Sequence, residues 1–322
     1  MTMNETKTAK NLNTVIKNNA TIIAGVLIII IFAVASGGTS ISLQNIINVT
    51  RQIAPLGVIA IGATFVMAVD EFDLAIGAIA SLGGLLAARF AELGLPLWAS
   101  FTVPLVIGFI IGFVNGFIVA RFRVLSFITT LGMSTVIGGL AYWLTNGASI
   151  NVNLPAGFNF FSRAIGRVPL QTIILFLVAL ACWFVMRHTT FGRKTYAIGG
   201  NQQAAGVSGI RVEEVKIIAY ALCALLAVFA GILTVSRNVS ATPTSGDGLF
   251  LQAYAAVFLG KTMFKNGVPN VWGTVVGAAI LGVLSNGLTI LAAPKFLTDL
   301  LTGAIIVIAV VAPKVSKKSR LS

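Results

Sequence analysis

The chain has 322 residues, of which 57% are apolar and only 10% are charged. Soluble domains are about 45–50% apolar and about 25% charged, so this composition excludes a soluble enzyme and a disordered chain. The two cysteines exclude a disulfide scaffold, and the net charge of +13 indicates a nucleic-acid partner only if the basic residues gather on one face. What remains is a helical protein that crosses a membrane several times.

Apolar runs, separated by charged residues, proline or Asn/Gly punctuation, predict the membrane spans. A helix needs about 20 mainly apolar residues to cross the hydrocarbon core. The runs occupy residues 22–36, 53–69, 75–91, 97–119, 124–145, 169–186, 215–237, 249–260, 270–291 and 296–312. The short run at 249–260 leaves open whether it crosses fully. We predict an all-α polytopic membrane protein of about ten transmembrane helices, some interrupted, with a tail at 1–21, a membrane domain at 22–312 and a basic tail at 313–322.

The basic residues orient these spans, because Lys and Arg in short loops stay on the cytoplasmic side. With the N-terminus inside, most of them fall in the two tails and in every second loop. They are Lys7, Lys10, Lys17, Arg121, Arg123, Arg187, Arg193, Lys194, Arg211, Lys216, Lys261, Lys265, Lys314, Lys317, Lys318 and Arg320. Both termini are therefore predicted to be cytoplasmic, and no nucleic-acid partner is indicated.

Three acids, Asp70, Glu71 and Asp73, stand between the second and third runs, with no room for an ordinary loop. Asp73 is suited to cap the helix that follows, since its carboxylate can accept hydrogen bonds from the free N–H groups near Ile76. Direct contact with a transported solute is the alternative. No histidine accompanies the acids, so a metal site or a proton relay is not favoured.

Glycines recur at every fourth position in two runs. Small residues let helices approach closely in lipid, so this spacing predicts packing seams within the bundle or between two copies. The glycines are Gly108, Gly112 and Gly116 in the fourth run, and Gly273 and Gly277 in the ninth.

The long inner segment at 187–214 contains a predicted short helix. Asn201 is a good N-cap, residues 202–208 make at most two turns, and Gly209 can end them in the left-handed conformation. A small-residue helix between basic flanks is suited to docking on a partner. A loop helix lying on the membrane is the alternative.

A second break follows the seventh run, between Arg237 and Gly248. Pro243 and the glycines prevent a continuous helix, and irregular backbone at membrane depth survives only against protein or water. The segment is either an ordinary outer loop or the wall of a polar cavity. In the second case the lining groups are Arg237, Ser240, Thr242, Asp247 and Gln252.

Motifs for chemistry are missing from the sequence. Gly260-Lys-Thr262 resembles the end of a phosphate-binding loop, but Ala255 stands where the loop needs its first glycine. The single histidine, two cysteines inside predicted spans and no Gly-x-Ser-x-Gly element indicate neither a metal site nor an enzyme. We predict that this chain binds no cofactor, and that any ATP is bound by a partner.

The inner segment resembles that of permease subunits of ribose-type ATP-binding-cassette (ABC) importers. The similarity is most specific in Gly192-Arg193, Tyr196-Ala-Ile-Gly-Gly-Asn201 and Ala204-Ala-Gly-Val-Ser-Gly-Ile210. Asp73-Leu-Ala-Ile-Gly77 and Asn286-Gly-Leu288 are also similar to elements of that family. The chain departs from the family where Gln252 precedes Ala255-Ala-Val257, since an acid is usual there, and this leaves the particular sugar open.

The resemblance implies a permease domain in a bacterial inner membrane, with an inverted repeat relating spans 2–5 to 7–10. It implies three protein partners: a separate ABC ATPase, an extracytoplasmic solute-binding protein and a second permease copy, identical or related. The residues of the implied ATPase-coupling helix are Gly199, Gly200, Asn201, Ala204, Ala205, Gly206, Ser208, Gly209 and Ile210. The candidate substrate path comprises Asp73, Arg237, Thr242, Asp247, Gln252 and Asn286.

The expected cargo is a small polar solute without charge, most simply a monosaccharide such as ribose. Few charges are placed inside the spans, and an ionic cargo needs a buried counter-charge. An autoinducer-like furanose, a nucleoside or a branched-chain amino acid stays open. A secondary transporter driven by an ion gradient is the alternative class, with Asp70, Glu71 and Asp73 as its candidate ion carriers.

Overall fold

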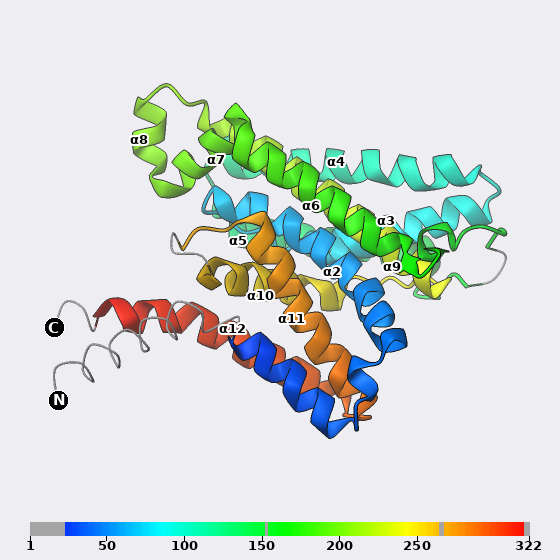
Figure 1. Cartoon of the computed structure of the whole chain (residues 1–322). Coiled ribbons are helices and arrows are strands. Elements are labelled where there is room, and N and C mark those ends of the chain that lie inside the picture. The colour runs from blue at the N-terminus through cyan, green and yellow to red at the C-terminus, as the bar shows by residue number, and fades with distance from the viewer. Residues whose placement is uncertain (1–22, 152–153, 264–266, 319–322) are drawn as a thin grey trace, which may run out of the picture.

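The computed structural model describes residues 23–151, 154–263 and 267–318, and these residues are almost entirely helical (Figure 1). The helices are Ile23–Ala35, α2 (Leu43–Ala68), α3 (Ile76–Glu92), α4 (Leu97–Phe122), α5 (Ser126–Thr145), α6 (Leu170–His188), α7 (Thr190–Gly200), α8 (Gln202–Val207), α9 (Val212–Asn238), α10 (Asp247–Met263), α11 (Val271–Ile290) and α12 (Lys295–Lys318). The minor elements are η1 (Thr39–Ile41), η2 (Phe160–Ser162) and the antiparallel strands β1 (Ala164–Ile165) and β2 (Val168–Pro169). The predicted tail at 1–21, with Lys7, Lys10 and Lys17, lies outside the described residues, as do Lys265 and Arg320.

Six helices, α2, α4, α5, α6, α9 and α11, are long and apolar enough to cross a membrane. The helix Ile23–Ala35 and the apolar part of α12, Phe296–Ile308, are shorter, and α3 and α10 have 17 residues each. The prediction of an all-α polytopic membrane protein is thus confirmed, while crossing by these four shorter elements stays a prediction.

Helix α2 differs most from its predicted bounds: it begins at Leu43, whereas the apolar run predicted a start near residue 53. Ser42 caps it by accepting a hydrogen bond from the Asn45 N–H at 3.3 Å. The apolar run is broken earlier by the polar pair Arg51 and Gln52, which nevertheless lie within the helix.

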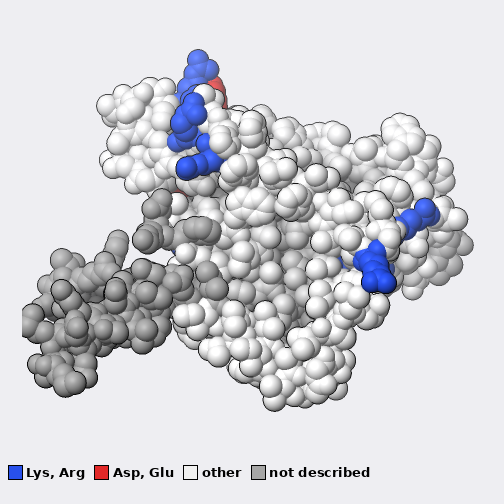
Figure 2. Space-filling model, in the orientation of Figure 1, with Lys and Arg blue, Asp and Glu red and all other residues white. Residues whose placement is uncertain are grey.

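Charged side chains separate toward the two ends of the bundle. Helix α8 lies at one end, and the connections from α3 to α4 and from α9 to α10 lie at the other (Figure 1). On the face shown in Figure 2, Lys and Arg gather near these ends and a broad uncharged belt lies between them. Such a belt is expected where the middle of the bundle faces hydrocarbon.

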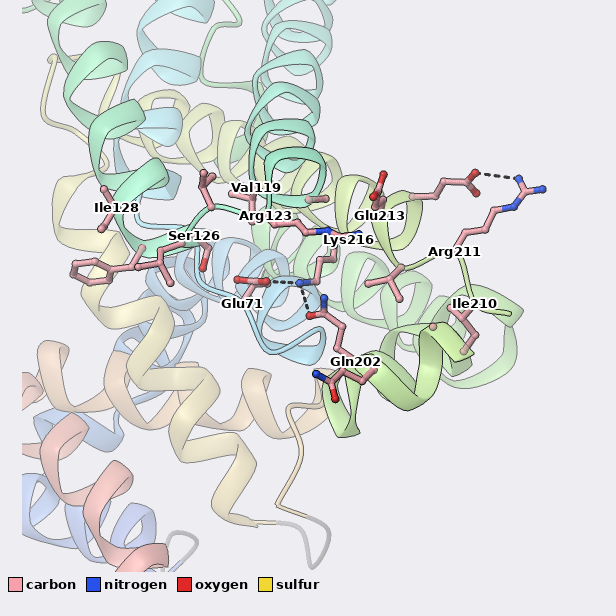
Figure 3. A pocket seen from close by; sticks show the side chains of 18 of the residues that line it. Glu71, Val119, Arg123, Ser126, Ile128, Gln202, Ile210, Arg211, Glu213 and Lys216 are labelled. Atoms are coloured by element: carbon pink, nitrogen blue, oxygen red, sulfur yellow. Dashed lines mark hydrogen bonds and ion pairs between the residues drawn. The ribbon is translucent and has the colours of Figure 1, made fainter. Parts of the chain in front are cut away.

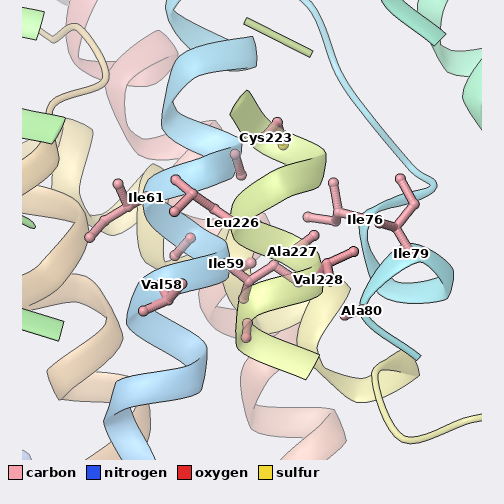
Figure 4. Packing of buried hydrophobic residues seen from close by; sticks show 14 of the residues in the cluster. Val58, Ile59, Ile61, Ile76, Ile79, Ala80, Cys223, Leu226, Ala227 and Val228 are labelled. Atoms are coloured by element: carbon pink, nitrogen blue, oxygen red, sulfur yellow. The ribbon is translucent and has the colours of Figure 1, made fainter. Parts of the chain in front are cut away.

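Helix α9 is the centre of the core, and α2, α3 and α4 surround it. Figure 4 shows Ile59 of α2, Ala80 of α3, and Ala227 and Val228 of α9 at the contacts between these helices. All four side chains are buried. Small and β-branched side chains therefore fill the space between closely spaced helices, which is the packing favoured in lipid.

The glycine series lie at two such contacts within the chain. A Cβ at Gly112 would stand 2.4 Å from the Tyr220 carbonyl oxygen of α9, and Gly108 and Gly116 meet the same helix. Across α11, a Cβ at Gly277 would overlap the backbone of α10 at Ala256. Gly273 lies equally close to α10.

Replacing Gly112 by Ala is expected to lower stability, because the added methyl group overlaps backbone that cannot move independently. Overpacking of this kind costs about 1–3 kcal/mol. Gly139→Ala in α5 is the matched control, since a Cβ there meets nothing within 4 Å. The apparent melting temperatures of the two purified variants in detergent should separate, and equal temperatures would contradict the α4–α9 seam.

Candidate coupling surface and solute cavity

Two short helices follow α6 and form the inner segment. Thr189 caps α7 by accepting from the Gly192 N–H at 3.3 Å, and Asn201 caps α8 by accepting from the Ala204 N–H at 2.9 Å. Helix α8 ends beyond Val207, and Gly209 takes a left-handed φ of 81°. The short helix expected at 202–208 is therefore present at 202–207, where local capping places it.

One side of this segment is fixed to the bundle and the other is open. Ala205 is buried, and a Cβ at Gly199 would overlap the Ala68 carbonyl at the end of α2. By contrast, a Cβ at Gly200 or Gly206 would meet nothing within 4 Å, and Val207 is 92% exposed. Val207 was not among the predicted coupling residues, and its exposure on α8 adds an apolar side chain to this open side.

An ion pair ties α8 to the helices behind it. Lys216 of α9 donates to the Glu71 carboxylate and to the Gln202 side-chain oxygen, the latter at 2.8 Å (Figure 3). The two charged side chains are only 7% and 17% exposed. Glu71 belongs to the turn between α2 and α3, so one lysine joins three separate segments.

Beside this pair an open cavity of about 1300 Å³ lies between α8, the start of α9 and the α4–α5 connection (Figure 3). Its walls combine charged groups with apolar side chains such as Val124, Phe127 and Ile210. A mixed concave surface next to an exposed helix is typical of a protein-docking site.

The turn from Glu71 to Ala75 is held by side chains from three other helices. Tyr254 of α10 accepts from the Asp73 N–H at 2.7 Å and donates to its carbonyl at 3.1 Å. Tyr220 of α9 donates to the Phe72 carbonyl, and Thr130 of α5 accepts from the Leu74 N–H, both at 2.9 Å. Almost every polar group of this irregular backbone is satisfied, as burial requires.

Asp73 is fully buried and accepts from the Ala75 N–H at 2.9 Å, one residue before α3 begins. The contact is a turn just ahead of α3 and not the predicted cap, because the N-cap residue is Ala75 and α3 has no side-chain cap hydrogen bond. Burial raises the pKa of the Asp73 carboxyl to about 7, with the Ala75 hydrogen bond acting weakly against it. The turn therefore holds this acid close to its neutral form.

Asp73→Ala should destabilise the chain by about 1–3 kcal/mol, because it leaves the buried Ala75 N–H without an acceptor. Asp73→Asn keeps an acceptor and carries no charge. Since the folded pKa exceeds the unfolded value, the wild type loses stability as pH rises above about 4, and the asparagine variant does not. Its melting temperature relative to wild type should therefore rise between pH 5 and pH 8, and a falling difference would contradict the assignment.

A second cavity, of about 450 Å³, lies near the opposite end of the bundle, where α2, α9, α10 and α11 meet. Arg237 and Gln252, two residues of the predicted path, line it. The remaining lining residues are Asn48, Arg51, Gln52, Leu56, Leu249, Gly282 and Ser285. The polar residues of α2 were missed because they precede the apolar run from which that span was predicted.

The other predicted path residues lie apart from this lining. Asp247 accepts from Ser81 at 3.5 Å, and the Thr242 hydroxyl lies 2.9 Å from that of Ser245. The Asn286 side chain accepts from Asn45 at 2.9 Å, and Asp73 lies in the turn described above. Of the six predicted path residues, the structure thus brings only Arg237 and Gln252 together. Asp73, Thr242, Asp247 and Asn286 each lie outside this cavity lining.

Within residues 23–151, 154–263 and 267–318, no three His, Cys, Asp or Glu side chains come together as a metal site would require. Cys223 is buried in the core, where burial keeps a thiol unreactive. The described residues thus form an open cavity of mixed lining beside α8 at one end and a polar cavity at the other.

Comparison with known proteins gives relatives over most of the chain. Residues 45–310 match the family described as branched-chain amino acid transport system / permease component. The ribose import permease protein RbsC of Escherichia coli K12 is 37% identical over 84% of this chain and 85% of that protein. RbsC of Bacillus subtilis 168 is 37% identical over 89% of both, and the xylose transport system permease protein XylH of E. coli K12 is 31% identical over 90% and 89%. No solved structure matches.

The family match covers the helices that build both cavities, α2 to α11, together with the inner segment. The similarity that the sequence showed in the inner segment thus extends over most of the membrane domain, from residue 45 to residue 310. The chain belongs to the permease family described as branched-chain amino acid transport system / permease component, whose members are the membrane subunits of ABC importers and are not themselves enzymes.

Proposed function

We propose that this chain is the membrane-spanning permease subunit of an ABC importer that carries a monosaccharide, with ribose and xylose as the first cargos to test. The observation that carries the proposal is the sustained identity with ribose and xylose permeases over more than four fifths of the chain. The polar cavity and the docking surface at opposite ends supply the two features that such a subunit needs.

Coupling to ATP would occur at the end that carries α8. In the proposed arrangement a separate ATPase contacts the open side of the inner segment, through Gly200 at the end of α7 and through Gly206 and Val207 of α8. Lys216 and the buried residues of the segment would pass its movement to the helices. An extracytoplasmic binding protein would deliver the sugar at the other end, where the second cavity lies.

The proposed topology has ten crossings with both termini in the cytoplasm of a bacterium and the protein in its inner membrane. The last turns of α12 reach the same end as α8, which supports this orientation (Figure 1). The break after α2 and the break after α9 are each followed by a helix of 17 residues, α3 and α10. This correspondence supports an inverted repeat of spans 2–5 and 7–10, since an offset of five crossings reverses direction.

A second copy of the chain, or a related permease, would complete the pore. Only 17% of the apolar window of α5 and 22% of that of α6 are buried within one chain. These helices therefore leave apolar surface for lipid and for a second subunit. Cysteines introduced on α5 or α6 would cross-link between two subunits where the second subunit covers a face, and would not where lipid covers it.

Uptake measurements test the function directly. The chain would be co-expressed with ATPase and binding-protein partners from ribose or xylose systems, and uptake of radiolabelled sugar into proteoliposomes measured with and without ATP. Uptake that needs ATP and both partners is the expected result. Uptake by the chain alone, driven by a proton or sodium gradient, would instead support a secondary transporter.

A further inference from the structure

The cavity near the outer end is lined by two guanidinium groups and no carboxylate. Arg51 comes from α2 and Arg237 from the last turn of α9, and Asn48, Gln252 and Ser285 complete the polar wall. Amides and a hydroxyl can donate and accept, but the only formal charges in this lining are positive.

Neither arginine has an acidic partner in the described chain. The four ion pairs among the described residues are formed by Arg89, Arg121, Arg211 and Lys216. Arg237 donates to the neighbouring Asn238 side chain at 3.3 Å, whereas the buried Nε of Arg51 has no acceptor among the described residues. Because an orphaned buried donor costs free energy, a ligand group that accepts from Arg51 would be favoured in this cavity.

We infer that the cavity binds the carboxylate of an acidic monosaccharide, an aldonic or uronic acid, and so favours it over the uncharged parent sugar. The inference rests on the proposed function and narrows it from monosaccharides in general. Guanidinium groups pair with carboxylates through two parallel hydrogen bonds, which are shorter and stronger than bonds to neutral hydroxyls. The amides and Ser285 would then take the sugar hydroxyls.

The size and position of the cavity suit such a ligand. A volume of about 450 Å³ lies within the range of small-molecule sites, roughly 300–1,000 Å³. All of the lining side chains named here come from four neighbouring helices, so relative motion of the helices would change the site. That is the behaviour a transport site needs, because the ligand must be bound on one side and released on the other.

Binding to the full chain in nanodiscs tests the inference, with D-galacturonate against D-galactose and D-ribonate against D-ribose as probes. We expect the acid of each pair to bind roughly tenfold more tightly, a difference of about 1.4 kcal/mol, and its advantage to shrink with added salt. Arg51→Gln and Arg237→Gln should each remove most of the preference. Arg163→Gln, at a separate apolar cavity, is the matched control and should preserve it.

A further variant keeps the inference testable if the two arginine variants fail to fold. Gln252→Asp places a carboxylate in the same lining, where it can pair with the guanidinium groups, and should shift the preference toward the neutral sugar. Equal responses to acid and parent sugar, including no response to either, would overturn the inference. ATP-dependent uptake of ribose or xylose would stand independently of that result, so failure of this inference is distinguishable from failure of the proposed function.

Discussion

Gly206→Pro is expected to abolish both association with the ATPase and ATP-driven uptake while leaving the membrane domain folded. Gly206 is the fifth of six residues in α8, and proline there removes a backbone N–H from a helix with few hydrogen bonds to lose. Proline costs about 3 kcal/mol in a helix interior, and such a short helix owes its shape to the Asn201 cap and to packing of Ala205.

Gly206→Ala is the control that separates helix disruption from surface change. A Cβ at this position meets nothing within 4 Å, and alanine favours a helix, so the variant should retain its fold and α8. Co-purification of a tagged ATPase with each variant, alongside gel-filtration profiles of the chain alone, makes the comparison. Retained co-purification with the proline variant would count against α8 as the coupling helix.

Lys216→Met is the second large expected effect, with a loss of about 3 kcal/mol in stability. The substitution leaves the Glu71 carboxylate largely buried without its counter-charge, and breaking one side of a buried pair costs about 3–5 kcal/mol. Because the Glu71 side chain is partly exposed, we expect a loss of stability at the lower end of this range. The Gln202 contact is lost as well, so α8 should also become less firmly held.

The double variant Glu71→Gln/Lys216→Met should recover part of the lost stability, because it removes the stranded charge. The pair Arg211 and Glu214, 79% and 60% exposed, provides the control: Arg211→Ala should cost less than about 1 kcal/mol. Thermal unfolding measures these differences. In an assembled transporter, Lys216→Met should also reduce sugar transported per ATP hydrolysed, and unchanged coupling would assign the pair a purely structural role.

Local sequence determined the features whose causes lie within a few residues. Asn201 contacts the N–H three positions ahead, Gly209 supplies the left-handed residue after α8, and Pro243 lies where the chain leaves α9 before α10 begins. Each predicted apolar run likewise corresponds to a helix, because lipid requires long stretches without charge. The apolar composition and the spacing of the apolar runs were therefore enough to predict the fold class.

Tertiary structure decided which polar residues belong together. Glu71 and Lys216 are 145 positions apart, and no local pattern pairs them. Arg51 ended the predicted apolar run, yet it lies inside α2, because the neighbouring helices supply a polar cavity that a single helix in lipid would lack. The sequence alone thus determines where helices form, since capping and hydrophobicity act locally, but it did not place the start of α2. Which charges become neighbours depends on helices brought together by packing, and the presence of Arg51 and Arg237 in one cavity carries the proposed preference for an acidic sugar.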